Sequence, residues 1–351
     1  MSTAQSQQVV VEATAKPQLA PFKFFEAMSA YQQTSALKAA IDLDLFSAIA
    51  ESSGTAAEVA ERIGAPERGV RALCDFLVVR AFLNKTLDRS GSRYSLTPDS
   101  AMFLDKKSPA YLGTATRFLA SETVTKAFRN LAEVVRSGGP LPCDVRSDKE
   151  DEMWVEFARS MAPVMFIVAQ QAAKLFAPDS EIKVLDIAAG HGMFGIQVAQ
   201  HNAKAKIVAL DWPSVLAIAK ENAERFQVAG RYSLLPGNAL EVPVGNNYDG
   251  VIVANFLHHM DRAAIRAFLK KMHAAMAPKG RIVVVEFAPN EDRVSPPIPA
   301  SFVLNMFANT PGGDAYSFSE YQEMLRAAGF SSCEVCSLPP TPQLAIVGVK
   351  E

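Results

Sequence analysis

The sequence predicts an α/β protein in which a helix-covered, mostly parallel sheet follows an N-terminal helical unit. After Pro178, short apolar runs alternate with helical stretches, which is typical of parallel strands joined by helices. These runs cover residues 182–187, 206–210, 232–235, 248–254 and 281–287. Two further strands, 332–337 and 343–349, follow each other across a proline-rich turn without an intervening helix. We therefore expect a C-terminal antiparallel hairpin to close the sheet.

The N-terminal unit, residues 21–110, shows the pattern of several helices followed by a small hairpin. Thr55 and Glu58, three residues apart, form the capping-box signature of a short helix. A second helix is expected over residues 67–82, followed by a polar segment and a returning strand that begins at Tyr94. This order of elements predicts a winged helix.

Four segments are predicted along the chain. The first residues lack both a basic start and a long apolar stretch, so they are expected to form a flexible tail and not a signal peptide. The segments are residues 1–20 (tail), 21–110 (winged-helix-like unit), 111–177 (helical linker) and 178–351 (sheet domain).

Composition limits the partners of this chain. Lys and Arg number 35 against 37 Asp and Glu, so charge gives no reason to expect a nucleic acid, although some winged helices bind DNA. No stretch reaches the roughly 18 uninterrupted apolar residues that a membrane span requires. The cysteines are few for 351 residues, which favours a reducing, cytoplasmic compartment. They are Cys74, Cys143, Cys333 and Cys336, and the last two are assigned to packing.

A glycine-rich turn follows the first strand of the sheet. Gly190, Gly192 and Gly195 satisfy G-x-G-x-x-G, a motif shared by nicotinamide enzymes and methyltransferases. Asp211 closes the second strand, where a carboxylate can accept hydrogen bonds from ribose hydroxyls. Asp186, just before the glycines, suits a cofactor with an amino group and a sulfonium better than an anionic pyrophosphate. These charges favour S-adenosylmethionine as the cofactor.

Three motifs follow in a fixed order and carry a family resemblance. They are Asn255-Phe-Leu-His-His-Met-Asp261, Ala277-Pro-Lys-Gly-Arg-Ile-Val-Val-Val-Glu286 and Thr310-Pro-Gly-Gly313. With them the chain resembles the O-methyltransferases of the plant caffeate type and their bacterial relatives. The resemblance implies a class I methyltransferase domain with a Rossmann-like sheet and an N-terminal winged-helix dimerisation domain. It also implies S-adenosylmethionine, a small-molecule acceptor and a homodimer.

The same resemblance implies the catalytic residues. His258 stands where the family has its general base, and an imidazole can accept a hydroxyl proton at neutral pH. Glu286 follows it by 28 residues, where the family has the glutamate that orients this histidine. His258 and Glu286 are therefore predicted as base and orienting residue of an O-methyltransferase.

The predicted cofactor contacts extend beyond the glycine turn and its carboxylates. They are Asp186, Gly190, Gly192, Gly195, Asp211, Trp212, Asn238, Ala239 and Asn255. Ala254 and Ala315 depart from the family pattern, because the plant enzymes carry a lysine and a second glutamate there. His259 replaces an aspartate.

The acceptor pocket is predicted from aromatic, methionine and asparagine side chains. Phe157-Ala-Arg-Ser-Met161 resembles the family element whose aromatic and methionine side chains enclose a flat acceptor ring, and Phe157 and Met161 lie four residues apart on one helical face. Phe302 and Met306 supply further polarisable apolar surface. The predicted acceptor-binding residues are Phe157, Met161, Asn255, Phe302, Asn305 and Met306. A small aromatic acceptor follows, although any one of the apolar residues could equally belong to an ordinary core.

Two alternatives remain open at this point. Paired His258 and His259 allow methylation of an activated carbon with a bound metal, but no third ligand is evident beyond Asp261, so no metal is predicted. The chain could also be a regulator that keeps the fold as a ligand sensor. The spacing of His258 and Glu286 favours the enzyme, because sensing requires neither residue.

Overall fold

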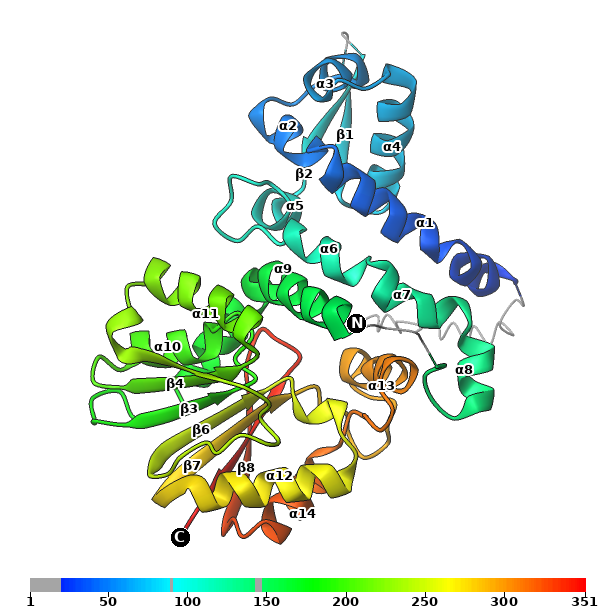
Figure 1. The fold of residues 1–351 in the computed structure, drawn as a ribbon. Helices are drawn as coiled ribbons and strands as arrows, with labels where there is room; N and C mark the ends of the chain where they lie inside the picture. Colours follow the sequence, from blue (N-terminus) through cyan, green and yellow to red (C-terminus); the bar gives the residue numbers. More distant parts are fainter. Residues whose placement is uncertain (1–19, 89–90, 143–146) are drawn as a thin grey trace, which may run out of the picture. The chain divides into compact units, whose positions relative to one another are not determined.

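Figure 1 shows the computed structural model, which describes residues 20–88, 91–142 and 147–351. The predicted tail and Cys143 lie outside these residues, apart from Ala20. The chain divides into two compact units after Lys106, four residues before the predicted boundary. Each unit is described by itself.

The first unit combines helices with a two-stranded sheet. Its elements are α1 (Phe22–Asp42), α2 (Leu45–Glu51), α3 (Ala56–Ile63), α4 (Glu67–Val79), β1 (Leu83–Asp88), β2 (Gly91–Leu96) and α5 (Pro98–Phe103). The predicted capping box is confirmed at α3, where Glu58 N donates to Thr55 Oγ1 and Thr55 N donates to Glu58 Oε2. β1 and β2 pair in antiparallel register, with Leu83 opposite Leu96, so the predicted hairpin after the helices is also confirmed.

The sheet of the second unit has seven strands among the described residues. They are β3 (Lys183–Ile187), β4 (Lys206–Asp211), β5 (Tyr232–Pro236), β6 (Tyr248–Ala254), β7 (Met276–Glu286), β8 (Ser332–Ser337) and β9 (Leu344–Val349). Their spatial order is β5-β4-β3-β6-β7-β9-β8; β9 runs antiparallel to both β7 and β8, and the other neighbours are parallel. The closing hairpin is therefore confirmed, whereas β7 begins five residues before the predicted run.

Helices cover both faces of this sheet (Figure 1). The helices and 3₁₀ turns are η1 (Gly113–Ala115), α6 (Thr116–Leu119), α7 (Glu122–Arg129), α8 (Leu131–Ser137), α9 (Ser147–Ala173), α10 (Met193–His201), α11 (Pro213–Arg225), η2 (Ala229–Arg231), η3 (Leu257–His259), α12 (Arg262–Ala275), α13 (Pro297–Asn309) and α14 (Phe318–Ala327). Alternate residues of the strands face opposite cores. Val184 and Ile252 pack with α9, α10 and α11, whereas Leu185 and Val253 pack with α12 and α14. No helix of the described residues is long and apolar enough to cross a membrane.

This arrangement places the functional candidates at one edge. β3, β4, β6 and β7 are parallel neighbours, so their carboxyl ends meet at the same edge of the sheet. The glycine turn follows β3, Asp211 ends β4, Asn255 follows β6, and Glu286 ends β7. Gly190 and Glu286, which lie 96 positions apart in the sequence, are thereby brought to the same edge of the sheet.

Candidate active site

The glycine turn connects β3 to α10 through left-handed backbone. Gly190 has φ 58° and Gly192 has φ 77°, a region that glycine occupies without steric cost. A Cβ at Gly195 would lie 2.7 Å from Ile207 Cγ2 and 2.8 Å from Asp186 Oδ2, so α10 can pack on the strands only with glycine there. A Cβ at Gly190, in contrast, would meet only the backbone oxygen of Ala188, at 3.8 Å. The turn is therefore tightly packed beneath and open at Gly190.

Two strand-end carboxylates hold this turn. Asp186 Oδ2 accepts from Gly195 N at 2.9 Å, and Asp211 Oδ2 accepts from Gly190 N at 2.7 Å. Burial raises the pKa of Asp186 to about 7, partly opposed by the Gly195 bond and reinforced by Asp211. Burial also raises the pKa of Asp211, against the opposing bonds from Gly190 N and Trp212 N. Asp186 is only 1% exposed and supports the turn from beneath, whereas Asp211 is half-buried beside the open side.

Asn238 and Ala239 were predicted to contact the cofactor at the same edge of the sheet. Their observed contacts lie within their own turn and in the core. Gly237 N donates to Asp211 O, which places this turn next to the end of β4. Asn238 Oδ1 accepts from Leu240 N and its Nδ2 donates to Glu241 Oε1. Ala239 is buried in the core with α12. Contacts from these two residues to the cofactor stay a prediction, as they do for the exposed Trp212.

His258 and Glu286 meet directly. The distance from His258 Nδ1 to Glu286 Oε2 is 2.6 Å, and both side chains are almost fully buried. Glu286 Oε1 accepts from the backbone N–H groups of Phe256, Leu257 and His258 at 2.9, 2.8 and 3.4 Å. With the carboxylate as acceptor, Nδ1 carries the proton and Nε2 keeps its lone pair. One carboxylate thus fixes the backbone of η3 and the orientation of the ring it carries.

A run of aromatic rings passes through His258. His258 lies edge-on to Phe302 at 4.9 Å and next to His259 at 4.4 Å between ring centroids. The run, called the aromatic cluster below, comprises Phe118, Trp154, Phe157, His258, His259, Phe287 and Phe302. Burial and the neighbouring His258 lower the pKa of His259 to about 3, so this second imidazole is neutral at pH 7. Phe118 and Phe287 were not predicted, because neither residue has a local motif that marks it.

Asn255 presents a polar atom to this region. Its backbone adopts φ 51°, and its N–H donates to Val285 O at 2.8 Å. Its Nδ2 contacts Met165 Sδ at 3.4 Å, and its Oδ1 is buried without a hydrogen-bond partner among the described residues. A buried acceptor without a partner is costly, so a donor from a bound ligand would stabilise it. Asn255 therefore fits its predicted place beside a cofactor or acceptor.

The remaining acceptor candidates lie in the core, in the aromatic cluster and on α13. Met161 and Met306 are buried, and Phe157 and Phe302 belong to the aromatic cluster. Asn305 Oδ1 accepts from Asn309 Nδ2 one turn along α13, so its observed contact lies within its own helix. A role for Asn305 in orienting the acceptor stays a prediction.

The alternative of a bound metal requires a further ligand beside His258 and His259. Asp261 caps α12, with Oδ1 accepting from Ala264 N at 2.8 Å. No group of three His, Cys, Asp or Glu in the described ranges is placed to hold a metal ion.

A sheet of this strand order with a glycine turn after its first parallel strand defines the class I methyltransferases. Comparison with known proteins agrees: models of an O-methyltransferase domain and an O-methyltransferase dimerisation domain match residues 132–331 and 25–106. The chain belongs to this O-methyltransferase family, and it is an S-adenosylmethionine-dependent O-methyltransferase.

Three relatives illustrate the likeness. A solved structure of a protein from Nostoc punctiforme, assigned as an O-methyltransferase, is 44% identical, with a TM-score of 0.89 over 95% of this chain and 100% of its own. The 3-hydroxy-5-methyl-1-naphthoate 3-O-methyltransferase of Streptomyces sahachiroi is 25% identical over 91% of this chain and 92% of its own. Human N-acetylserotonin methyltransferase, solved with S-adenosylmethionine, shares the fold at 21% identity and a TM-score of 0.83, over 96% of this chain and 99% of its own.

The raised pKa of Asp186 predicts a distinctive pH dependence of stability. An ordinary aspartate has a pKa near 3.9 when unfolded, so between about pH 4 and pH 7 the folded state binds more protons than the unfolded state. Ionisation of this buried carboxyl group therefore lowers the free energy of unfolding as pH rises through that window. Asp186→Asn, which cannot ionise, should gain a few kcal/mol relative to the wild type between pH 4 and pH 7. Urea denaturation at pH 5 and pH 8 measures this; a difference between the two proteins that is independent of pH would contradict it.

Proposed function

We propose that this enzyme transfers methyl to a hydroxyl group of a small aromatic acceptor, with His258 as the general base. The observation that carries the proposal is the 2.6 Å bond between His258 Nδ1 and Glu286 Oε2, deep in the core and next to the aromatic cluster. It leaves Nε2 as the proton-accepting atom of a ring whose position is fixed.

The acceptor class is supported by the surroundings of His258. Phe302 presents its ring against the imidazole, and Trp154 and His259 continue the aromatic surface on the other side. Flat aromatic ligands pack well on such surfaces, and Met161, Met165 and Met306 can adapt to their outline. The naphthoate acceptor of the Streptomyces enzyme and the N-acetylserotonin acceptor of the human enzyme are both fused bicyclic compounds with a ring hydroxyl.

Residues of the glycine turn and its neighbours would hold the cofactor. Gly190 offers open backbone, Asp211 a partly exposed carboxylate and Asn255 a buried oxygen without a partner, so the residues present fit S-adenosylmethionine. Asp186 would hold the turn from beneath through its bond with Gly195 N. When bound, the cofactor supplies a methyl group on a sulfonium, the electrophile that an oxygen can attack.

His258 and Glu286 would move the proton. The acceptor O–H bond would break as its proton passes to Nε2, while the oxygen gains the methyl group, whose carbon–sulfur bond would break to leave a neutral thioether. The ring is then an imidazolium, and Glu286 Oε2 stabilises its charge through the Nδ1–H bond. Because both side chains are nearly inaccessible to solvent, water competes little for these groups.

We also propose that the chain acts as a homodimer through its first unit. The matched dimerisation domain covers residues 25–106, and α1 exposes a series of large apolar side chains. They are Phe22, Phe24, Phe25, Met28 and Tyr31, each more than 60% exposed. A soluble monomer seldom exposes such a row, so a second copy of the chain is the occupant that the family likeness favours.

Loss of the proposed base should lower turnover strongly. His258→Ala and Glu286→Gln are expected to lower kcat by about 10²-fold or more, because general-base catalysis contributes about that much. Methyl transfer to N-acetylserotonin and a set of hydroxynaphthoates, measured by mass spectrometry, tests this. His201→Ala, on the exposed end of α10, is the matched control. Full activity of His258→Ala would refute the proposed mechanism.

Loss of the carboxylate at the end of β4 should weaken cofactor binding. Asp211→Ala removes both a ligand acceptor and the bond that holds Gly190 N, so S-adenosylmethionine should bind about tenfold more weakly or worse. Isothermal titration measures the Kd. Asp249→Ala is the control, since Asp249 accepts from Lys183 N at the opposite edge of the sheet. Equal affinity in the two variants would argue against this cofactor site.

Polar substitution on α1 should dissociate the dimer. Phe24→Ser with Phe25→Ser removes two exposed rings, 62% and 61% accessible, and is expected to shift the molecular mass from dimer to monomer in light scattering. Leu87→Ser on β1, 83% exposed, is the matched control and should leave the dimer intact. A monomeric wild-type chain would overturn the proposal.

A further inference from the structure

The turn that carries His258 is held on two sides. Glu286 accepts its N–H groups, and the segment 310–316, called the clamp loop below, contacts its carbonyl groups. Asp314 N donates to His258 O at 3.0 Å, and Tyr316 Oη donates to Met260 O at 2.7 Å. Gly313 packs so closely on His258 O that any Cβ there would clash. The position of the imidazole therefore depends on the clamp loop as well as on Glu286.

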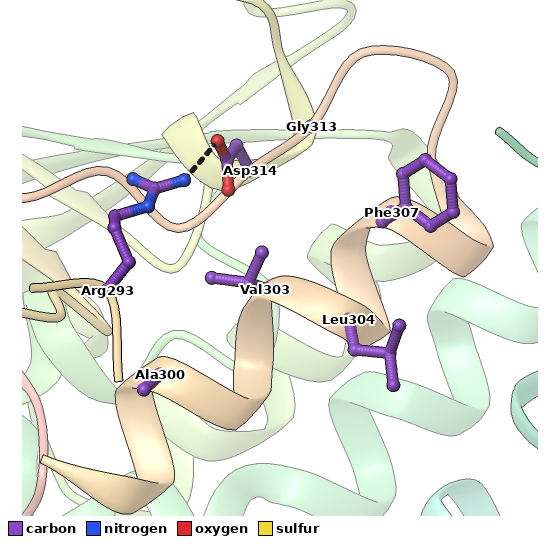
Figure 2. Close-up of a pocket in the computed structure, with 7 residues that line it drawn as sticks. All are labelled: Arg293, Ala300, Val303, Leu304, Phe307, Gly313 and Asp314. Carbon is purple, nitrogen blue, oxygen red and sulfur yellow. Dashed lines mark hydrogen bonds and ion pairs between the residues drawn. The ribbon is translucent and has the colours of Figure 1, made fainter. Parts of the chain in front are cut away.

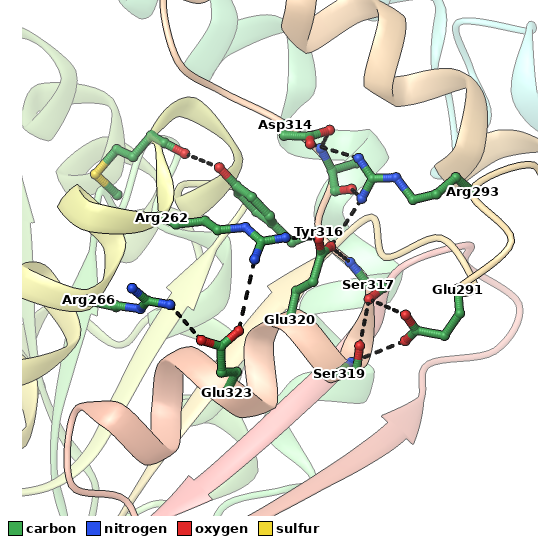
Figure 3. Close-up of polar contacts among 12 residues, drawn as sticks. Arg262, Arg266, Glu291, Arg293, Asp314, Tyr316, Ser317, Ser319, Glu320 and Glu323 are labelled. Atoms are coloured by element: carbon green, nitrogen blue, oxygen red, sulfur yellow. Dashed lines mark hydrogen bonds and ion pairs between the residues drawn. The ribbon is translucent and has the colours of Figure 1, made fainter.

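A single guanidinium holds the clamp loop in place. Arg293 Nη2 donates to Asp314 Oδ2 at 2.7 Å, and Arg293 Nη1 donates to Ala315 O and Glu320 Oε2, each at 3.0 Å (Figure 3). Glu320 also accepts from Ser317 N at 2.7 Å and pairs with Arg262. The planar guanidinium thus joins a side chain and a carbonyl group of the loop to the start of α14, a geometry that suits arginine better than lysine.

Arg293 is itself presented by a folded loop after β7. Its backbone has φ 61°, and its N–H donates to Asn290 O at 2.9 Å. Asn290 N donates to Ser295 O, and Asp292 Oδ1 accepts from both Val294 N and Ser295 N. β7 and the loop after it therefore act on both sides of the turn that carries His258. Glu286, the last residue of β7, accepts N–H groups of the turn, and Arg293, in the following loop, binds the clamp loop that contacts its carbonyl groups.

We propose that Arg293 is a positioning residue for His258, acting through the clamp loop. This inference rests on the proposed role of His258 as the base. The plant enzymes that the chain resembles carry a second glutamate where Ala315 stands, and in this chain the carbonyl oxygen of Ala315 accepts from Arg293 Nη1.

The guanidinium lies at the edge of a cavity of about 370 Å³ (Figure 2). Arg293 and Asp314 form one side of this cavity, and α13 forms the other with Val303, Leu304 and Phe307. A small cation in solution can therefore reach Asp314 when the arginine side chain is removed.

The experiment compares Arg293→Ala and Arg293→Lys with the matched control Arg266→Ala in the full chain. Arg266 is similarly exposed and pairs with Glu323 in the same layer of charges, but it does not contact the clamp loop. In Arg293→Ala, kcat for N-acetylserotonin or a hydroxynaphthoate should fall about tenfold, as expected for a misplaced base, with the Kd for S-adenosylmethionine changed less than about twofold. Arg293→Lys should lie between this variant and the wild type, and Arg266→Ala should match the wild type.

Two further measurements separate positioning from general destabilisation. Guanidinium chloride at millimolar concentration should restore part of the kcat of Arg293→Ala and leave Arg266→Ala unchanged. Hydrogen exchange, followed by mass spectrometry, should become faster in residues 256–260 and 310–316 of Arg293→Ala alone.

The outcomes are distinct. An unchanged kcat in Arg293→Ala, a parallel loss of cofactor affinity, or unchanged exchange at these segments would overturn the inference. If the wild type itself transfers no methyl group, the proposed function fails, and the exchange measurement still decides whether Arg293 holds the turn. If Arg293→Ala does not fold, Arg293→Lys carries the same comparison.

Discussion

The arrangement of the active site depends on the buried carboxylate of Glu286. A charged group without contact to water is costly unless hydrogen bonds and an ion pair compensate it. Here three backbone N–H groups and the ring of His258 provide that compensation. The chain after β6 must therefore wrap around the end of β7, and His258 is brought to its position as a consequence. The bonds that satisfy this carboxylate are thus the same bonds that orient the imidazole of His258.

The glycine turn is built in the same way. Asp186 and Asp211 end neighbouring strands and accept N–H groups of the turn after β3, as Glu286 accepts those of the turn after β6. Parallel strands place these ends side by side, so the two turns face a common edge. The two sets of bonds differ in their partners. Glu286 accepts from an imidazole as well as from backbone N–H groups, whereas Asp186 and Asp211 accept from backbone N–H groups and burial raises their pKa values.

The sequence predicted the parts of this site that local rules determine. Alternating apolar runs locate the strands, and the glycine turn with Asp186 and Asp211 follows from local rules, whereas His258 and Glu286 were predicted from the family resemblance. The start of β7 at Met276 and the boundary after Lys106 were harder to predict from the sequence. Strand pairing decides the first, and packing within each unit decides the second. Side-chain partners were the hardest to predict. Phe118 joins the aromatic cluster only because α6 packs on α9, and Asn238 is engaged by its own turn.

Different parts of the second unit hold the backbone of His258 and surround its ring. The turn that carries His258 is held by hydrogen bonds to its backbone, and Glu286 and Tyr316 are side chains that take part in them directly. The surfaces around the ring come instead from Trp154 and Phe157 on α9 and Phe302 on α13. Substitutions on these helices alter the aromatic surface beside His258 without removing the bonds that hold its backbone. His259 is the exception, because it belongs to the turn itself and also to the aromatic cluster, so a change there alters the aromatic surface and the electrostatic environment of His258 together.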